Sequence, residues 1–296
     1  MYYYRIYGMQ LASDIALRQL PAVSAGEEFP QITVSEAPFP DTLKADSVCY
    51  SHIAADVSYL SNSHCYLLVK GGTRIFYERK KDTPDALLSS YLLGWGISML
   101  LHQQNKLAIH GSCVSGPKGA ILLCGDSGSG KSTLTSALLK KGYCLMADDI
   151  TMLDCSDEAS VSAYAAFPYQ KLCRDAVRRL GISEEELIYI DEAKDKFLVP
   201  YRGYFPTGPV PVQAMIMLSL SDTDRVFSAE VTGIAKFQAC MNSLFLRPLL
   251  GEALYTPENG VRGLTLASRI PVYHIIRPVG YDTREIILKQ LLTYIR

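Results

Sequence analysis

The chain has 296 residues, of which 48% are hydrophobic and 20% are charged, a composition typical of globular proteins and unlike that of disordered or fibrous chains. Its 29 Lys and Arg nearly balance 30 Asp and Glu, for a net charge of −1, so no overall positive field would attract nucleic acid. The longest nearly apolar run, Tyr91 to Leu101, is shorter than the roughly 20 residues of a membrane-spanning helix. We therefore expect a cytoplasmic protein with no nucleic-acid or membrane partner, and reduced thiols, since its eight cysteines include no Cys-x-x-Cys pair.

The first eighty residues carry short runs that are typical of β-strands. These runs are Tyr2 to Tyr7, Gln31 to Ala37, His64 to Lys70 and Thr73 to Arg79. The pair Gly71-Gly72 separates the last two runs and predicts a tight hairpin turn with positive φ angles. A charged stretch then leads into a helix at Pro84, with Asp82 or Thr83 as its N-cap. We expect a small β-rich N-terminal domain over 1–82, whose exposed strand edges take part in acceptor recognition, and a second domain over 83–296.

The remainder of the chain alternates between helical and extended patterns, which predicts an α/β fold. The first element is a helix over Asp85 to Gln103, in which apolar residues recur at helical spacing. After it we expect strands at Leu107 to Val114 and Ala120 to Cys124, a helix at Lys131 to Lys141, and strands at Tyr143 to Ala147 and Ile150 to Leu153. Farther on we expect a capping box over Ser183 to Glu186, a buried strand at Val212 to Leu220, a helix at Ile234 to Leu246 and a last helix capped by Asp282.

One segment carries a phosphate-binding pattern. Residues 125 to 132 read Gly-Asp-Ser-Gly-Ser-Gly-Lys-Ser, which fits G-x-x-x-x-G-K-[ST], and they stand between an apolar strand pattern and a helical one. In such a loop the backbone amides hold nucleotide phosphates, the lysine reaches the β- and γ-phosphates and the serine hydroxyl binds Mg²⁺. The alternative is an ordinary turn with helix-capping glycines. We assign nucleotide binding to Gly125, Asp126, Ser127, Gly128, Ser129, Gly130, Lys131, Ser132 and Thr133.

A pair of carboxylates follows the loop closely. Asp148 and Asp149 come 17 residues after Lys131, behind a short apolar strand, and the carboxyl end of such a strand lies beside the phosphate loop. One carboxylate can bind Mg²⁺ while the other accepts a proton from an attacking hydroxyl. An isolated Asp-Asp pair is more often an acidic turn, but this distance behind a phosphate loop favours catalysis.

A histidine precedes the loop. His110 lies in the strand pattern Leu-Ala-Ile-His-Gly-Ser, 21 residues before Lys131. A histidine among apolar residues is usually a core or turn residue, yet beside a phosphate loop it can contact a phosphoryl group or orient a carboxylate. We interpret His110 as a functional residue.

Together these motifs resemble the catalytic core of the HPr kinase/phosphorylase superfamily, in which a histidine, a phosphate loop and an Asp-Asp pair occur in this order. That core is similar to the nucleotide domain of phosphoenolpyruvate carboxykinase. The opening Tyr4 to Pro21 and the segment Leu92 to Val114 resemble, more narrowly, the HPr-kinase-like proteins of peptide biosynthesis, including lasso-peptide kinases that phosphorylate a serine of a precursor. The resemblance is specific from Leu92 to Leu153 and thin beyond it.

The resemblance implies a role for each matching residue. His110 would contact the transferring phosphoryl group, Lys131 and Ser132 the nucleotide phosphates and Mg²⁺, Asp148 the metal and Asp149 the acceptor hydroxyl as general base, although the two aspartates could exchange roles. The chain has no counterpart of the second HPr-kinase signature, a Gly-rich segment with an arginine. HPr as the substrate and the phosphate-driven reverse reaction are therefore doubtful.

Downstream cations offer further candidates. Lys171, Lys196 and Arg247 could each add positive charge to a phosphoryl-transfer site, but each is more simply interpreted as a surface cation. Nothing in the sequence favours Arg262, Arg269 or Arg277 over these three cations as site residues.

The leading hypothesis is a Mg²⁺-ATP-dependent serine kinase acting on a peptide or small protein. A small-molecule kinase that uses free serine and a nucleotide-sensing binding module without transfer activity are the alternatives. The sequence leaves open whether the chain forms a homo-oligomer.

Overall fold

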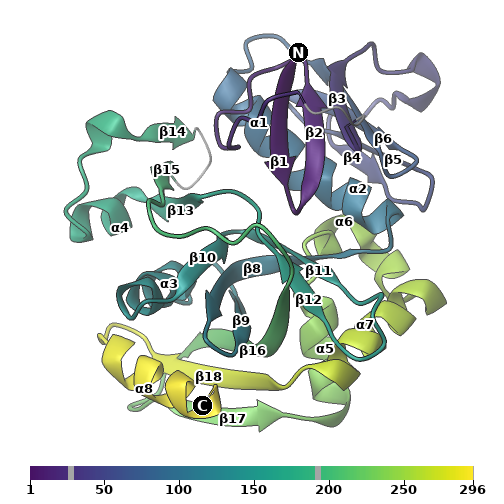
Figure 1. Cartoon of the computed structure of the whole chain (residues 1–296). Coiled ribbons are helices and arrows are strands. Elements are labelled where there is room, and N and C mark those ends of the chain that lie inside the picture. Colours follow the sequence, from purple (N-terminus) through teal and green to yellow (C-terminus); the bar gives the residue numbers. More distant parts are fainter. Residues whose placement is uncertain (26–29, 191–194, 296) are drawn as a thin grey trace.

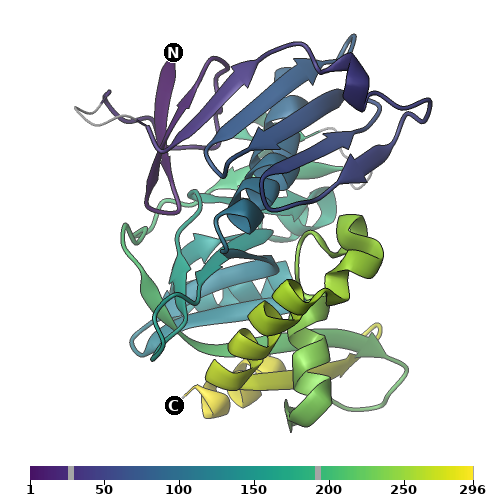
Figure 2. The same cartoon turned by 90° about the vertical axis from the view of Figure 1, so that its right-hand side faces the viewer.

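A computed structural model describes residues 1–25, 30–190 and 195–295 and places their strands in three sheets (Figures 1 and 2). The first sheet has seven strands in the order β1-β2-β3-β7-β6-β5-β4. Its strands are β1 (Tyr2–Ile6), β2 (Met9–Ser13), β3 (Ile32–Glu36), β4 (Tyr50–His52), β5 (Val57–Ser61), β6 (Cys65–Lys70) and β7 (Arg74–Arg79). The four strands expected from the sequence of this region are all present within two residues of their expected ends, and β2, β4 and β5 are added to them.

The hairpin between β6 and β7 forms as expected. Gly71 and Gly72 have φ angles of 59° and 63°, a region of backbone space that other residues rarely adopt. The N-cap expected at Asp82 or Thr83 is wrong, because Pro84 occupies that position without a side-chain cap and the Thr83 hydroxyl instead donates to the His64 carbonyl. The following helix is thereby tied to the edge of β6.

The expected helix over residues 85 to 103 is one continuous rod with a widened turn at its centre. It consists of α1 (Asp85–Tyr91), the π-helical turn η2 (Leu92–Gly96) and α2 (Ile97–Gln103). Leu92, Ile97 and Leu100 are almost fully buried, and this face packs on the seven-stranded sheet. Figure 2 shows the rod running behind that sheet and down to the larger one.

The second sheet has eight strands and holds the phosphate loop. Its order is β10-β8-β11-β12-β16-β18-β17, with β9 between β8 and β16. Its strands are β8 (Leu107–Gly116), β9 (Gly119–Gly125), β10 (Cys144–Ala147), β11 (Ile150–Asp154), β12 (Ser162–Tyr164), β16 (Val210–Ser221), β17 (Phe227–Val231) and β18 (Val272–Pro278). The strands expected between residues 107 and 153, and the strand expected at Val212 to Leu220, are confirmed within three residues of their ends.

Successive side chains of the larger sheet face opposite layers of the molecule, as strand geometry requires. On β9, Leu122 belongs to the apolar cluster that also contains the first sheet and the rod, while Ile121 and Leu123 face α3 (Lys131–Lys140) and α8 (Arg284–Tyr294). The first cluster also takes in residues of α5 (Gly233–Asn242) and α7 (Pro257–Arg269). One apolar core therefore reaches from the N-terminal sheet into the larger sheet, and the division at residue 82 stays a prediction.

A third, three-stranded sheet with its own small apolar cluster packs at the side of the molecule. Its strands are β13 (Tyr169–Cys173), β14 (Ile188–Ile190) and β15 (Lys196–Pro200), and α4 (Arg174–Arg179) directly follows β13 in the chain. In Figure 1, β13 and β15 lie directly above β10. This placement brings β13 over the edge of the larger sheet at which β10 ends. The other short elements are η1 (Asp41–Leu43), η3 (Glu184–Glu186), α6 (Arg247–Leu250) and η4 (Gly251–Tyr255).

Three expectations for the C-terminal half need correction. Ser183 makes no capping hydrogen bond, and only a three-residue 3₁₀ turn follows it. The helix expected over Ile234 to Leu246 ends at Asn242, because residues 243 to 245 run beside β8, where the Phe245 amide donates to the Ala108 carbonyl. Thr283 rather than Asp282 is the N-cap of α8. Among the described residues, no helix combines the length and apolar character needed to cross a membrane.

Candidate active site

The phosphate loop leaves the end of β9 and enters α3. Gly125, Gly128 and Gly130 have φ angles of 135°, 88° and 107°, conformations that let consecutive amides turn toward one centre. A side chain at Gly125 would collide with the carbonyl of Leu218, since its Cβ would lie 2.1 Å from that oxygen. The strand-loop-helix context expected from the sequence is therefore present, and glycine is required where the pattern has it.

Two side chains of the loop have the chemistry of a phosphate site. Lys131 turns its ammonium back onto the carbonyls of Gly125 and Asp126, and burial lowers its pKa while the nearby Asp148 and Asp149 partly oppose that effect. Ser129 is 2% exposed, and its hydroxyl has no hydrogen-bond partner in the part of the chain that the structure describes. Because buried polar groups are normally paired, an orphan hydroxyl inside the loop fits a site that a phosphate completes.

Arg277 at the end of β18 holds the loop from outside. Its guanidinium donates to the carbonyls of Ser129 at 2.8 Å and Gly128 at 3.1 Å. By binding these carbonyls, Arg277 fixes the peptide planes whose amides face the other way. The sequence offers Arg277 only as one of several downstream arginines, because nothing around it distinguishes it from Arg262 and Arg269.

The aspartate pair lies where two strands meet along β8. Both β10 and β11 pair with β8, Ala147 opposite Cys113 and Ile150 opposite His110. Asp149 has a φ angle of 85°, a left-handed conformation that is uncommon for a residue other than glycine. Such strain is of order 1–3 kcal/mol and is found most often at functional sites. β9 and β10 each run antiparallel to β8, so the phosphate loop and the aspartates emerge at the same edge, as the sequence predicted.

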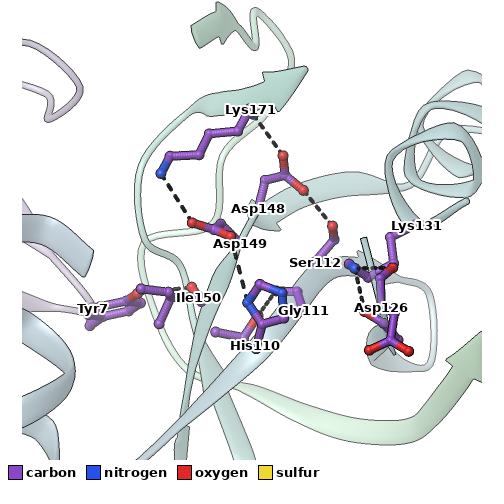
Figure 3. A network of polar contacts seen from close by, with 12 residues as sticks. Tyr7, His110, Gly111, Ser112, Asp126, Lys131, Asp148, Asp149, Ile150 and Lys171 are labelled. Atoms are coloured by element: carbon purple, nitrogen blue, oxygen red, sulfur yellow. Dashed lines mark hydrogen bonds and ion pairs between the residues drawn. The ribbon is translucent and has the colours of Figure 1, made fainter. Parts of the chain in front are cut away.

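Asp148 is buried and held by hydrogen bonds on both oxygens. Its Oδ1 accepts from the Ser112 hydroxyl, and its Oδ2 accepts from the backbone amide of Lys171 at 2.8 Å (Figure 3). Burial raises its pKa, and these two hydrogen bonds only partly offset that effect. Its carboxylate points toward β13 and Ser112, on the side of the pair that faces away from Tyr7.

Asp149 has a different environment. Its Oδ2 lies 3.1 Å from the ammonium of Lys171, and its Oδ1 lies 3.7 Å from Nδ1 of His110 (Figure 3). Burial would raise its pKa, but the charges of Lys171, His110 and Lys196 outweigh burial and lower it. Asp149 is therefore the member of the pair that carries a stable negative charge.

His110 stands beside Asp149 with its imidazole partly open to solvent. Burial lowers its pKa, and Lys131, Lys196 and Lys171 add to the decrease while Asp149 opposes it. The ring lies against Phe245 with a centroid distance of 5.8 Å, and this contact holds it in place.

The structure brings together most of the residues singled out from the sequence. Lys131, Asp148, Asp149 and His110 meet at one edge of the sheet (Figure 3). Lys171, interpreted as a surface cation, is only 12% exposed in its side chain and binds the aspartates instead. Arg247 lines a separate hollow of about 480 Å³, together with Pro248, Gly251, Leu254 and Tyr255.

Ser112 and Tyr7 were not recognised in the sequence. Ser112 had a signal, since strand alternation places it on the same side as His110 two residues earlier. Tyr7 had none. Its buried hydroxyl donates to the Ile150 carbonyl at 2.9 Å, one residue after Asp149, from the far N-terminal end of the chain.

Comparison with known proteins gives a match over part of the chain. A stretch of 135 residues is 40% identical to an HPr kinase/phosphorylase of Mycoplasmopsis pulmonis. The matched stretch is HPr kinase-like. It covers 44% of this chain and 40% of that relative, so the chain spans well under half the relative's length. No family model matches the chain.

A solved structure gives a weaker likeness. The HPr(Ser) kinase/phosphatase of Coxiella burnetii aligns with 63% of this chain and 95% of its own length, at 14% sequence identity and a TM-score of 0.32. The fold itself is α/β with a phosphate loop between a central strand and a helix. The 40% identity over 135 residues supports the superfamily resemblance inferred from the motifs.

Proposed function

We propose that the protein is an ATP-dependent kinase that transfers the γ-phosphoryl group to a serine hydroxyl of a peptide or small protein. The observation that carries this proposal is the juxtaposition of a phosphate loop with two aspartates of opposite pKa behaviour. A lowered pKa keeps Asp149 ionised and able to accept a proton, while Asp148 is held in a fixed orientation by Ser112 and Lys171.

The nucleotide phosphates would lie against the amides of Gly128 to Ser132. Lys131 would leave the loop carbonyls for the β- and γ-phosphates, and the orphan hydroxyl of Ser129 would gain a partner. These donors stabilise negative charge that builds up on the transferring group, which is the main requirement of phosphoryl transfer.

The described residues contain no cluster of three or more His, Cys, Asp or Glu that could hold a metal by themselves. This fits Mg²⁺, which binds through one or two protein oxygens together with phosphates and water. Ser132 and Asp148 would hold it, and it would neutralise phosphate charge when bound. The proposed ligand set thus remains that expected from the sequence.

Asp149 would act as the general base. The seryl O–H bond breaks as its proton passes to the Asp149 carboxylate, an O–P bond forms to the γ-phosphorus, and the bond to the β,γ-bridging oxygen breaks to release ADP. Lys171 keeps the carboxylate charged, and His110, lying beside it, would contact the transferring phosphoryl group.

The acceptor class rests on the resemblance to peptide-modifying kinases, and a ribosomally made precursor peptide is the form we propose. The full-length protein should be incubated with Mg²⁺-ATP and serine-bearing peptides, and the products examined by mass spectrometry for the gain of one phosphoryl group. Competition by free serine would instead point to a small-molecule kinase. Tight ATP binding with no phosphorylated product from any hydroxyl donor would contradict the proposal and favour a nucleotide-sensing module.

A further inference from the structure

The loop between β18 and α8, residues 279 to 283, exposes two large apolar side chains. Val279 is 59% exposed and Tyr281 is 69% exposed, on either side of Gly280, whose φ angle of 80° turns the chain. Within the described residues, the ring of Tyr281 makes no contact with another ring and its hydroxyl makes no hydrogen bond. A single exposed side chain needs no explanation by itself, so the position of this loop decides what its open ring can do.

The loop begins where the larger sheet meets the phosphate loop. β9, β16 and β18 run parallel, so their carboxyl ends lie at one edge of the sheet, the edge at which α/β sheets bind ligands. Arg277 near the end of β18 donates to the carbonyls of Ser129 and Gly128. Tyr281 comes four residues later, and its Cα therefore lies no more than roughly 14 Å from that of Arg277. The loop is thus close to the proposed phosphate site.

The elements around the loop support this placement. α8, which the loop enters, packs on α3, the helix that follows the phosphate loop. Hydrogen bonds from Arg284 lower the pKa of Asp282 to about 2, and the charge of Arg179 at the end of α4 adds to the decrease. In Figure 1, α4, α3 and the start of α8 lie on the same side of the molecule. The loop therefore lies among the elements that surround α3.

The neighbouring loop does not offer the same surface. Residues 222 to 226 follow β16 and include two aspartates, whose charges would repel nucleotide phosphates. The aromatic ring that comes next, Phe227, already has a partner, because the guanidinium of Arg225 lies 4.9 Å from its centre. Of the loops that follow β16 and β18, the second is the one that presents an aromatic ring without a partner in the described chain.

We propose that Tyr281 is the platform on which the adenine base of ATP stacks while the phosphate loop holds the phosphates. The proposal rests on the proposed function and adds to it a residue that binds the nucleoside. Stacking on an aromatic ring uses the flat face of a base and needs no hydrogen bonds to its edge, so an exposed ring on a turn is sufficient. Arg277 connects the two parts, since it contacts the phosphate loop and lies in the strand that leads to Tyr281.

The test is calorimetric titration of the full-length protein with two ligands. One is Mg²⁺-ATP, and the other is Mg²⁺-tripolyphosphate, which has the three phosphates but neither ribose nor base. Tyr281→Ala should weaken ATP binding about tenfold, because one base–aromatic stack is lost, and should leave tripolyphosphate binding unchanged. Tyr281→Phe keeps the ring and should bind ATP within about twofold of the wild type.

Tyr255→Ala is the matched control. Tyr255 is 60% exposed in η4, and its neighbour Leu254 belongs to the apolar cluster on the other face of the larger sheet from α3 and α8. This variant should bind both ligands like the wild type.

Equal ATP affinities of Tyr281→Ala and the wild type would overturn the assignment. An equal loss of affinity for ATP and tripolyphosphate would also overturn it, because the substitution would then act on the phosphate loop and not on the base. These measurements need no phosphoryl transfer, so the kinase proposal is judged separately. If the wild type gave no phosphorylated product while Tyr281→Ala selectively lost ATP affinity, the kinase proposal would fail and the platform would stand.

Discussion

The phosphate loop and the acidic turn at Asp148 and Asp149 are built in different ways. The loop is one continuous segment whose shape comes from its own glycines. The acidic turn depends on Ser112, Lys171 and Tyr7, which come from three distant parts of the chain. The nucleotide-binding part of the site is therefore local, whereas the part proposed for acceptor chemistry is set by tertiary contacts.

The same contrast appears within the acidic turn. Asp148 and Asp149 are adjacent and have the same side chain, yet the pKa of one is raised and that of the other is lowered. Burial raises the pKa of Asp148, and its hydrogen bonds from a hydroxyl and an amide only partly offset this effect. At Asp149 burial acts in the same direction, but the nearby charges of Lys171, His110 and Lys196 outweigh it. Division of labour between the two carboxylates thus arises from the fold.

The substitution Asp149→Asn gives the largest expected effect, because it removes the proposed base from the acidic turn and leaves the phosphate loop unchanged. Because Asn accepts positive φ angles readily, the turn should keep its shape while the base is lost. We expect the transfer rate to fall about 10³-fold and ATP affinity to stay within a few fold, measured by phosphopeptide formation and by calorimetry. Unchanged transfer would remove Asp149 from the mechanism.

The substitution Lys131→Ala tests the phosphate loop, the part of the site that is built from one local segment. Loss of the ammonium should weaken both ATP binding and transfer, the latter about 10²-fold, since it removes one phosphate-stabilising group. Lys140→Ala, at the exposed far end of the same helix, is the control and should behave like the wild type. If ATP affinity survived in Lys131→Ala, the loop would not hold the phosphates as proposed.

Lys171→Gln tests how far the charge of Asp149 depends on β13. A base must be ionised to act, so activity is lost as the pH falls through the pKa of Asp149. Removing Lys171 removes a cause of the low pKa, and the acid limb of the kcat profile should move to higher pH by roughly one unit. An acid limb that stays in place would show that His110 and Lys196 suffice.

Tyr7→Phe is the mildest test and concerns the contact between the N-terminal sheet and the turn. Loss of the hydrogen bond to Ile150 should lower the free energy of unfolding by about 1 kcal/mol, as measured by denaturant titration. Tyr2→Phe in the exposed part of β1 is the matched control. Equal stabilities of the two variants would mean that the Tyr7 contact contributes nothing.

Elements built from local signals could be predicted from the sequence. The Gly71-Gly72 hairpin, the strand and helix around the phosphate loop, and the emergence of Asp148 at the same edge all follow from patterns within a few residues. Lys171 and Lys196 could not be distinguished from Arg247 in this way, because only the packing of the third sheet decides which cations act on the aspartates. The early end of α5 has the same origin, since residues 243–245 pair with β8 in place of a longer helix.

One apolar cluster joins Leu67 and Ile75 of the first sheet, Leu92 and Ile97 of the rod and Leu122 of the larger sheet. A fragment without the first sheet would expose the apolar face of the rod to water and would aggregate. Exchanging the first sheet for that of another protein is therefore a poor way to change the acceptor.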